Sequence, residues 1–238
     1  MNTRNEVLAV FFLATILSMT IGCGSGGDSD KPDRGEKSIA TTSSGAEAPD
    51  SSNTGSSEKA QTSDAKPKVA IETNLGTVIV LLYPEKAEIT VQNFLQYVDE
   101  GHYDGTVFHD VSKDIAIIGG GYTKDMQQKK ERHPIRNEAH NGLKNVRGTI
   151  AMVRKPDVID SATCQFMFNL ADNDFLDHKD REKAETYGYC VFGKVIEGMD
   201  VVDKIGAQQV KEVKVPDGAP FTRVPAETVT ISSIRRIK

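Results

Sequence analysis

The sequence predicts a mostly-β fold: a closed antiparallel barrel of about eight strands with two helices covering its ends. Residues 68–73 alternate apolar and polar side chains, Asn74-Leu75-Gly76 supplies turn chemistry, and residues 77–83 are strongly β-prone, which together indicate a hairpin. Two helical segments do not alternate with the strands as βαβ units would, so a closed barrel fits better than a parallel sheet. Six further short β-like segments complete the count, at residues 106–111, 115–118, 148–153, 165–170, 189–196 and 229–237.

The two predicted helices are amphipathic. The first starts from Thr90, which occupies the position of an N-cap, and ends before Gly101, with apolar residues at helical spacing between them. The second covers residues 199–205 and ends at Gly206. Each helix has one apolar face to bury against the barrel.

The beginning of the chain has the pattern of a lipoprotein signal. An apolar run over residues 7–21 follows Arg4 and is short for a membrane-spanning helix. It leads into Thr20-Ile21-Gly22-Cys23, which resembles the lipobox of bacterial lipoproteins although Thr20 stands where leucine is usual. We therefore expect residues 1–22 to be a lipoprotein signal peptide and Cys23 to carry a lipid anchor to a membrane. An ordinary signal cleaved nearby, with Cys23 incidental, is the alternative.

A polar segment separates this signal from the remaining chain. Residues 23–66 consist mainly of Ser, Thr, Gly, Asp, Glu, Lys, Ala and Pro and contain no aromatic residue, so they cannot bury enough apolar surface to offset their ordering entropy. We expect a disordered linker with a reach of roughly 35 Å. Residues 67–238 then form one domain, expected to be a monomer on the periplasmic side of the bacterial cell envelope. The net charge of -5, with scattered basic residues, argues against nucleic acid as a partner.

Cysteines, histidines and glycines were considered as chemical sites. Cys164 and Cys190 lack metal-ligand spacing; two buried free thiols are the favoured interpretation, and a disulfide is the alternative. The five histidines show no metal-binding pairing, and no metal or cofactor is expected. His109 and Asp110 could be an acid-base pair only if neighbours on a strand shared a face, which alternation opposes. The glycines 119–121 match no phosphate-loop spacing and are interpreted as a loop that approaches another backbone closely.

Seven motifs, in order over residues 67–238, resemble those of the cyclophilin-type peptidyl-prolyl isomerases. They are Thr90-Val-Gln-Asn-Phe, Tyr103-Asp-Gly-Thr-Val-Phe-His109, Ile118-Gly-Gly-Gly-Tyr122, Arg147-Gly-Thr-Ile-Ala-Met152, Cys164-Gln-Phe-Met-Phe168, Phe175-Leu-Asp177 and Val191-Phe-Gly-Lys-Val195. The stretches 126–130 and 169–173 look like those of bacterial periplasmic members. The resemblance implies an eight-stranded barrel capped by two helices, whose outer face binds X-Pro segments of proline-containing polypeptides and accelerates rotation about the peptide bond without metal or cofactor.

The resemblance also shows where this sequence departs from the family. Aligned without a gap, the family's catalytic arginine falls on Asp110, a pocket phenylalanine on Ile115, a methionine on Ala116 and a substrate-binding glutamine on Ile118. An ionised Asp110 cannot donate a hydrogen bond to the twisting amide, and loss of one such donor typically lowers the rate 10²- to 10³-fold. We therefore expect weakened isomerase activity.

Other positions that the resemblance assigns to substrate binding are better preserved. Gln165 matches a backbone-binding glutamine, and Met167 replaces a pocket phenylalanine. For these residues the alternative is that they only pack the barrel. Arg154 is a candidate to replace the missing donor, and Lys113 is a weaker one. The full set of expected substrate-binding residues is His109, Ile115, Ala116, Ile118, Val153, Arg154, Gln165, Met167, Phe175, Leu176 and Tyr189.

Two functions follow from these residues. The first is an envelope-anchored peptidyl-prolyl cis-trans isomerase that assists folding, with reduced activity. The second is a non-catalytic, chaperone-like module that binds proline-containing peptides.

Overall fold

The structure, a computed structural model, describes residues 66–215 and 218–238. The predicted signal peptide, Cys23 and all of the predicted linker except Lys66 lie outside the described residues. None of the helices within these ranges has the length and apolar character needed to cross a membrane.

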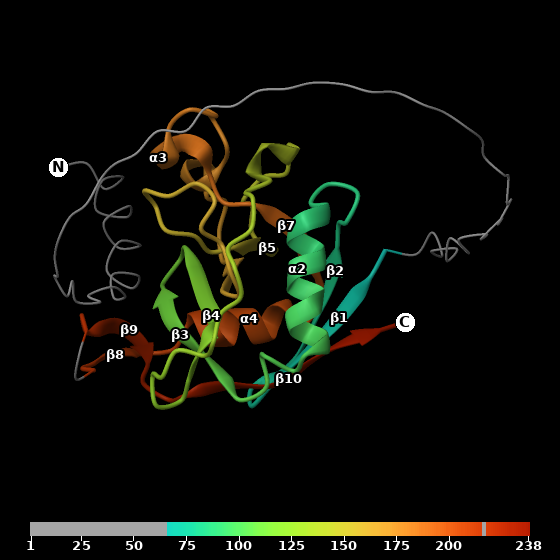
Figure 1. Cartoon of the computed structure of the whole chain (residues 1–238). Helices are drawn as coiled ribbons and strands as arrows, with labels where there is room; N and C mark the ends of the chain where they lie inside the picture. Colours follow the sequence, from blue (N-terminus) through green and yellow to red (C-terminus); the bar gives the residue numbers. More distant parts are fainter. Residues whose placement is uncertain (1–65, 216–217) are drawn as a thin grey trace, which may run out of the picture. The chain divides into compact units, whose positions relative to one another are not determined.

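Eight antiparallel strands close into a barrel in the order β1-β10-β3-β4-β6-β5-β7-β2, which confirms the predicted fold class (Figure 1). Strands β8 and β9 form a separate two-stranded sheet. The strands are β1 (Lys68–Thr73), β2 (Gly76–Leu82), β3 (Thr106–Ser112), β4 (Ala116–Thr123), β5 (Thr149–Met152), β6 (Phe166–Asn169), β7 (Val191–Glu197), β8 (Val210–Val213), β9 (Phe221–Pro225) and β10 (Val229–Ile237). The helices are α2 (Glu88–Asp99), α3 (Ala184–Tyr187) and α4 (Met199–Gly206), with 3₁₀ turns η1 (Ala139–Asn141) and η2 (Asp174–Leu176).

The barrel interior is apolar and fully buried. Val111, Ile117, Phe168 and Ile150 stand in register on β3, β4, β6 and β5, and none is more than 2% exposed. Directly opposed residues in a sheet point to the same face, so this row defines the inner face of the strands. Burial of each such side chain stabilises the fold by roughly 2 kcal/mol.

Helix α2 begins three residues earlier than predicted, and Thr90 is not its N-cap. Ala87 precedes the helix without a side-chain cap. The carboxylate of Glu138 instead accepts hydrogen bonds from the backbone of Ile89 at 3.2 Å and of Thr90 at 2.8 Å, and from Thr90 Oγ1 at 2.7 Å. A residue 48 positions away therefore caps the helix, an arrangement that local sequence patterns do not encode.

The glycines 119–121 lie in strand β4 and not in a loop, and their closest neighbours are side chains and not backbone. Gly120 has φ +88, and a Cβ there would lie 2.8 Å from the Tyr103 ring and 2.9 Å from the Phe166 ring. A Cβ on Gly121 would lie 2.6 Å from the side chain of Gln165. Glycine is needed because aromatic and glutamine side chains press against this strand.

The β8–β9 hairpin was not predicted from the sequence. Its strand β9 packs against β3, as the red and green strands of Figure 1 show. Val224 of β9 is buried with Val107 and Met126, and Phe221 packs beside them. The hairpin thus covers the side of β3 beyond its short pairing with β10, which runs only from Thr106 to Phe108.

Candidate functional site

A row of outward-facing residues crosses five strands of the barrel. Asp110 of β3 pairs with Ile118 of β4, Ile118 with Met167 of β6, Met167 with Ala151 of β5, and Ala151 with Val191 of β7. The row alternates with the buried inner row, so it lies on the outer face. Asp110 is its only charged member and stands at one end.

The apolar members of this row belong to one cluster, which we call the outer cluster. Its buried members are Ala116, Ile118, Ala151, Met167, Leu176, Tyr189 and Val191, and the partly buried Ile115, Leu143, Val153 and Phe175 pack against them. Eight of the predicted substrate-binding residues are brought together here: Ile115, Ala116, Ile118, Val153, Met167, Phe175, Leu176 and Tyr189.

A chain of buried asparagines holds the loops around the outer cluster. Asn173 Nδ2 donates to Asn169 Oδ1 at 2.8 Å, and Asn169 Nδ2 donates to Asn145 Oδ1 at 3.2 Å. Buried amides of this kind fix loop geometry because each lost bond would leave an unsatisfied polar group. Further amide hydrogens of the chain go to backbone carbonyls of site residues, Leu176 at 3.1 Å, Tyr189 at 3.2 Å and Ile115 at 2.9 Å.

The side chain of Asp110 forms a partly buried ion pair with Arg223 of β9. Arg223 Nε donates to Asp110 Oδ1 at 3.1 Å and Arg223 Nη2 donates to Oδ2 at 2.6 Å, which is a bidentate arrangement. The side chain of Asp110 is 7% exposed and that of Arg223 19%. Burial raises the pKa of Asp110, and the charge and hydrogen bonds of Arg223 act against that rise. The carboxylate at the position that the resemblance assigns to a catalytic arginine thus has a guanidinium beside it.

His109 lies next to this pair but outside the outer cluster. Its ring contacts Tyr122 at 4.7 Å and Phe221 of β9 at 6.1 Å between centroids, and it is 1% exposed. Burial lowers the pKa of His109 to about 4, so the ring is neutral at neutral pH. Among the described residues, its Nδ1 is a buried side-chain nitrogen without a hydrogen-bond partner.

Strand alternation alone does not describe this part of β3. The pairing of β3 with β4 shifts register between Phe108 and Asp110. Such an irregularity re-aims side chains, and Phe221 and Arg223, two residues apart on β9, contact His109 and Asp110 respectively. His109 and Asp110 both face the hairpin, but each has its own partner.

Arg154 is committed to a loop at the other edge of the outer cluster. Its Nε donates to the carbonyl of Gly188 at 2.9 Å, Nη1 to those of Lys155 and Pro156 at 2.9 Å each, and Nη2 to that of Ala184 at 2.5 Å. These bonds use four of its five N–H donors. The guanidinium also lies 5.0 Å from the ring centre of Tyr189. This geometry gives Arg154 a structural task and does not favour it as the replacement donor.

Gln165 connects Val153 of the outer cluster with the glycines of β4. It is 8% exposed, and its backbone carbonyl accepts a hydrogen bond from the amide of Val153 at 3.0 Å. Its side chain presses on Gly121 of β4. The predicted set lacks five contributors to this region: Ala151, Val191 and Leu143 of the outer cluster, and Phe221 and Arg223 of the β8–β9 hairpin. The turn signal Pro216-Asp217-Gly218 between two β-prone stretches could have indicated the hairpin that carries the last two.

The two cysteines among the described residues are free thiols. Cys164 and Cys190 are both buried, which confirms the favoured interpretation, and burial raises the pKa of each thiol to about 12. Neither is a reactive thiolate at neutral pH.

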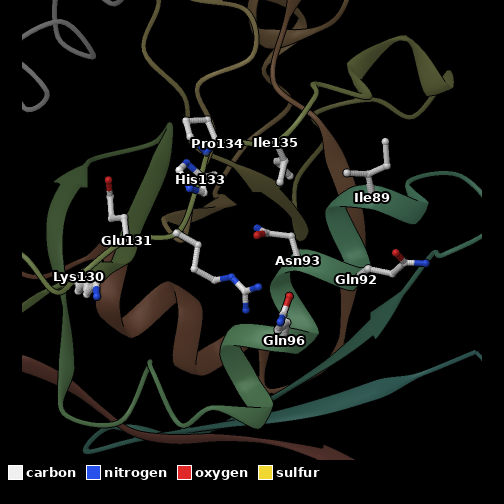
Figure 2. A pocket seen from close by; sticks show the side chains of 10 residues that line it. Ile89, Gln92, Asn93, Gln96, Lys130, Glu131, His133, Pro134 and Ile135 are labelled. Atoms are coloured by element: carbon white, nitrogen blue, oxygen red, sulfur yellow. The ribbon is translucent and has the colours of Figure 1, made fainter.

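A hollow, which we call the α2 hollow, lies between α2 and the segment 130–135. It has a volume of about 820 Å³, and none of its lining residues belongs to the outer cluster. Figure 2 shows Gln92, Asn93 and Gln96 of α2 on one side and Lys130, Glu131 and neighbouring residues on the other. Most of its lining residues are polar, and it is open to solvent.

Comparison with known proteins identifies the class that this barrel and outer face define. Residues 68–236 match the family "Cyclophilin type peptidyl-prolyl cis-trans isomerase/CLD". The chain therefore belongs to the cyclophilin-type peptidyl-prolyl cis-trans isomerase family.

Individual relatives support this assignment. The chain is 45% identical over 170 residues to peptidyl-prolyl cis-trans isomerase A of Dickeya dadantii (strain 3937), a match that covers 71% of this chain and 84% of the relative. It is 45% identical over 164 residues to peptidyl-prolyl cis-trans isomerase B of Escherichia coli (strain K12), covering 69% and 99%. A crystal structure of a Cryptosporidium parvum cyclophilin-type isomerase in the presence of the dipeptide Ala-Pro shares the fold, with a TM-score of 0.57, 20% identity and coverage of 72% and 99%.

Proposed function

We propose that this protein is an envelope-anchored prolyl isomerase that binds X-Pro segments on the outer cluster and turns them over more slowly than members with arginine on β3. The observation that carries the proposal is the outer row, which places an apolar surface beside a charged group. Rotation about an X-Pro bond meets a barrier of ~20 kcal/mol and takes tens to hundreds of seconds unaided. An apolar surface that holds the proline ring, with a donor at the twisting amide, lowers that barrier.

The reduced rate follows from Asp110. Members of the family are expected to present arginine here, whereas Asp110 is acidic and buried against Arg223. A guanidinium beside a carboxylate stabilises negative charge on a substrate carbonyl less than an unpaired one, because the two charges largely cancel at a distance. An acidic residue at position 110 also favours the alternative function, a module that binds proline-containing peptides without turnover. The following experiment distinguishes the two functions.

Turnover and binding should be measured together on the full-length protein in detergent. A protease-coupled assay with an Ala-Pro peptide should give a kcat/KM about 10²- to 10³-fold below that of the E. coli relative. Phe175→Ala should weaken peptide binding about tenfold by removing a partly exposed aromatic wall. Ile89→Ala is the matched control, because Ile89 is 40% exposed and lines the α2 hollow, away from the outer cluster. Binding without turnover would support the non-catalytic module instead. The absence of both binding and turnover would refute the proposed function.

The envelope location is supported by the sequence pattern that ends at Cys23. A protein with a lipidated cysteine should incorporate radiolabelled palmitate and sediment with membranes when expressed in a bacterium. Cys23→Ser should abolish the label and release the protein. Label retained in that variant would overturn Cys23 as the anchor, while Cys164→Ser serves as the control because Cys164 is buried.

A further inference from the structure

We propose that a group of basic side chains at the Val191 end of the outer row binds a carboxylate of the polypeptide substrate, beside its X-Pro segment. The group, which we call the basic rim, consists of His140, His178, Arg136 and Arg181. The inference rests on the proposed isomerase function and adds to it a preference for substrates with acidic residues near proline.

The basic rim adjoins the outer cluster through two segments. Val191 stands at the end of the outer row that is opposite Asp110. Asn141, which follows His140 in η1, donates from Nδ2 to the carbonyl of Val191 at 2.9 Å. Leu176, a buried member of the outer cluster, stands two residues before His178. A peptide that crosses the outer cluster toward Val191 therefore leaves it beside the two histidines.

Tyr187 holds these histidines side by side. Its ring centroid lies 5.0 Å from that of His178 and 6.5 Å from that of His140, and the two imidazole centroids are 6.2 Å apart. His178 Nδ1 lies 2.7 Å from the backbone carbonyl oxygen of Tyr187. A carbonyl can only accept, so this nitrogen carries the proton and donates it. The hydrogen bond and the ring contacts thus fix the imidazole of His178 before a ligand arrives.

The two arginines of the basic rim have no anionic partner among the residues that the structure describes. The side chains of Arg136 and Arg181 are exposed and form neither an ion pair nor a hydrogen bond there. The carbonyl of Asn137, next to Arg136, accepts a hydrogen bond from Tyr187 Oη at 3.3 Å, which holds this segment against the loop that carries Arg181. Two unpaired guanidiniums at one site disfavour a metal ion between the histidines and favour a carboxylate.

The surroundings of His140 have a positive potential. Burial lowers the pKa of His140, and the nearby cations that lower it further are Arg181, His178 and Arg136. Glu138 acts against them, but its carboxylate already accepts hydrogen bonds from the backbone of α2. A carboxylate bound among these groups favours the charged form of His140, so its binding raises this pKa and is tighter at pH 6 than at pH 8.

The test compares two peptides that differ only in charge. One is an Ala-Pro peptide with a glutamate on each side, about three residues from proline, because half the width of five strands is about 10 Å; the other has glutamines there. Fluorescence anisotropy on the full-length protein in detergent measures binding. We expect the glutamate peptide to bind about five- to tenfold more tightly at low ionic strength, and less than about twofold more tightly in about 0.5 M salt.

Variants assign this preference to the basic rim. Arg136→Gln/Arg181→Gln should reduce it to less than about twofold and leave binding of the glutamine peptide unchanged. Lys86→Gln/Lys130→Gln, which removes the same charge from exposed residues before α2 and in the α2 hollow, is the matched control and should keep the preference. In an NMR titration, the imidazole signal that His140→Asn removes should show a raised pKa with the glutamate peptide and no change with the glutamine peptide.

The outcomes distinguish this inference from the proposed function. If the two peptides bind equally to the unmodified protein, or if Arg136→Gln/Arg181→Gln keeps the preference, the inference is wrong and the proposed function stands. Equal binding of the peptides, together with binding of anionic lipid vesicles that this variant loses, would assign the basic rim to a membrane and also overturn the inference. Failure of both peptides to bind refutes the proposed function itself.

Discussion

An arginine lies at each of two edges of the outer cluster, Arg154 buried and Arg223 partly buried, and the two arginines have different partners. Arg154 donates to four backbone carbonyls, which are neutral. Arg223 donates to a carboxylate that stands in the outer row itself. The first arrangement cross-links a loop and leaves a net positive charge inside it. The second makes a locally neutral pair at the end of the outer row. A buried guanidinium is therefore evidence of function only when its partner and its position are known.

The comparison implies that Arg154 matters mainly for stability. Arg154→Met should lower the free energy of unfolding by about 4 kcal/mol, because four buried or partly buried carbonyls lose their charged donor at once. Urea denaturation of the full-length protein measures this change. Arg154→Lys should recover less than half of it, since an ammonium cannot reach carbonyls on several sides.

A matched surface control sharpens that result. Arg147 donates to the carbonyl of Leu170 and to Asp203, but its side chain is 47% exposed. Arg147→Met should therefore change the free energy of unfolding by less than about 1 kcal/mol. Equal losses for Arg147→Met and Arg154→Met would contradict the structural role given to Arg154.

The sequence predicts the inner face of the barrel and most of the outer cluster well. Alternation and turn chemistry locate the strands because burial of one face imposes a period of two, and family motifs place Met167, Leu176 and Tyr189 together. That Asp110 stands where the resemblance assigns a catalytic arginine can be seen in the sequence. The ion pair that Asp110 forms cannot, because Arg223 lies 113 positions away on a hairpin that was not predicted.

The same limit applies wherever a partner is distant or a local rule is broken. Glu138 caps α2 from 48 positions away, and a register shift in β3 turns both His109 and Asp110 toward the hairpin. Tertiary contacts of this kind override local preference, so they can be found only once the topology is known. Once the topology is known, Phe221 is expected to pack against a residue of β3, and its ring contacts that of His109.

The hairpin edge, unlike the Arg154 edge, should also respond to mild acid. The pKa of His109 is lowered by burial to about 4, whereas a histidine in the unfolded chain titrates near 6.5. The unfolded chain therefore binds more protons between these values, and the stability that a neutral His109 provides is present above pH 6.5 and lost as pH falls toward 4. The loss amounts to up to about 3 kcal/mol by proton linkage.

Denaturation curves of the unmodified protein and of His109→Gln, taken at intervals from pH 7 to pH 4, measure this loss as the difference between the two profiles of unfolding free energy against pH. Asp110, whose pKa burial raises, acts with the opposite sign but is present in both proteins, so its contribution largely cancels. Parallel profiles would mean that the ring is already solvated in the folded state, and Phe221 would then not seal β3 as the structure indicates.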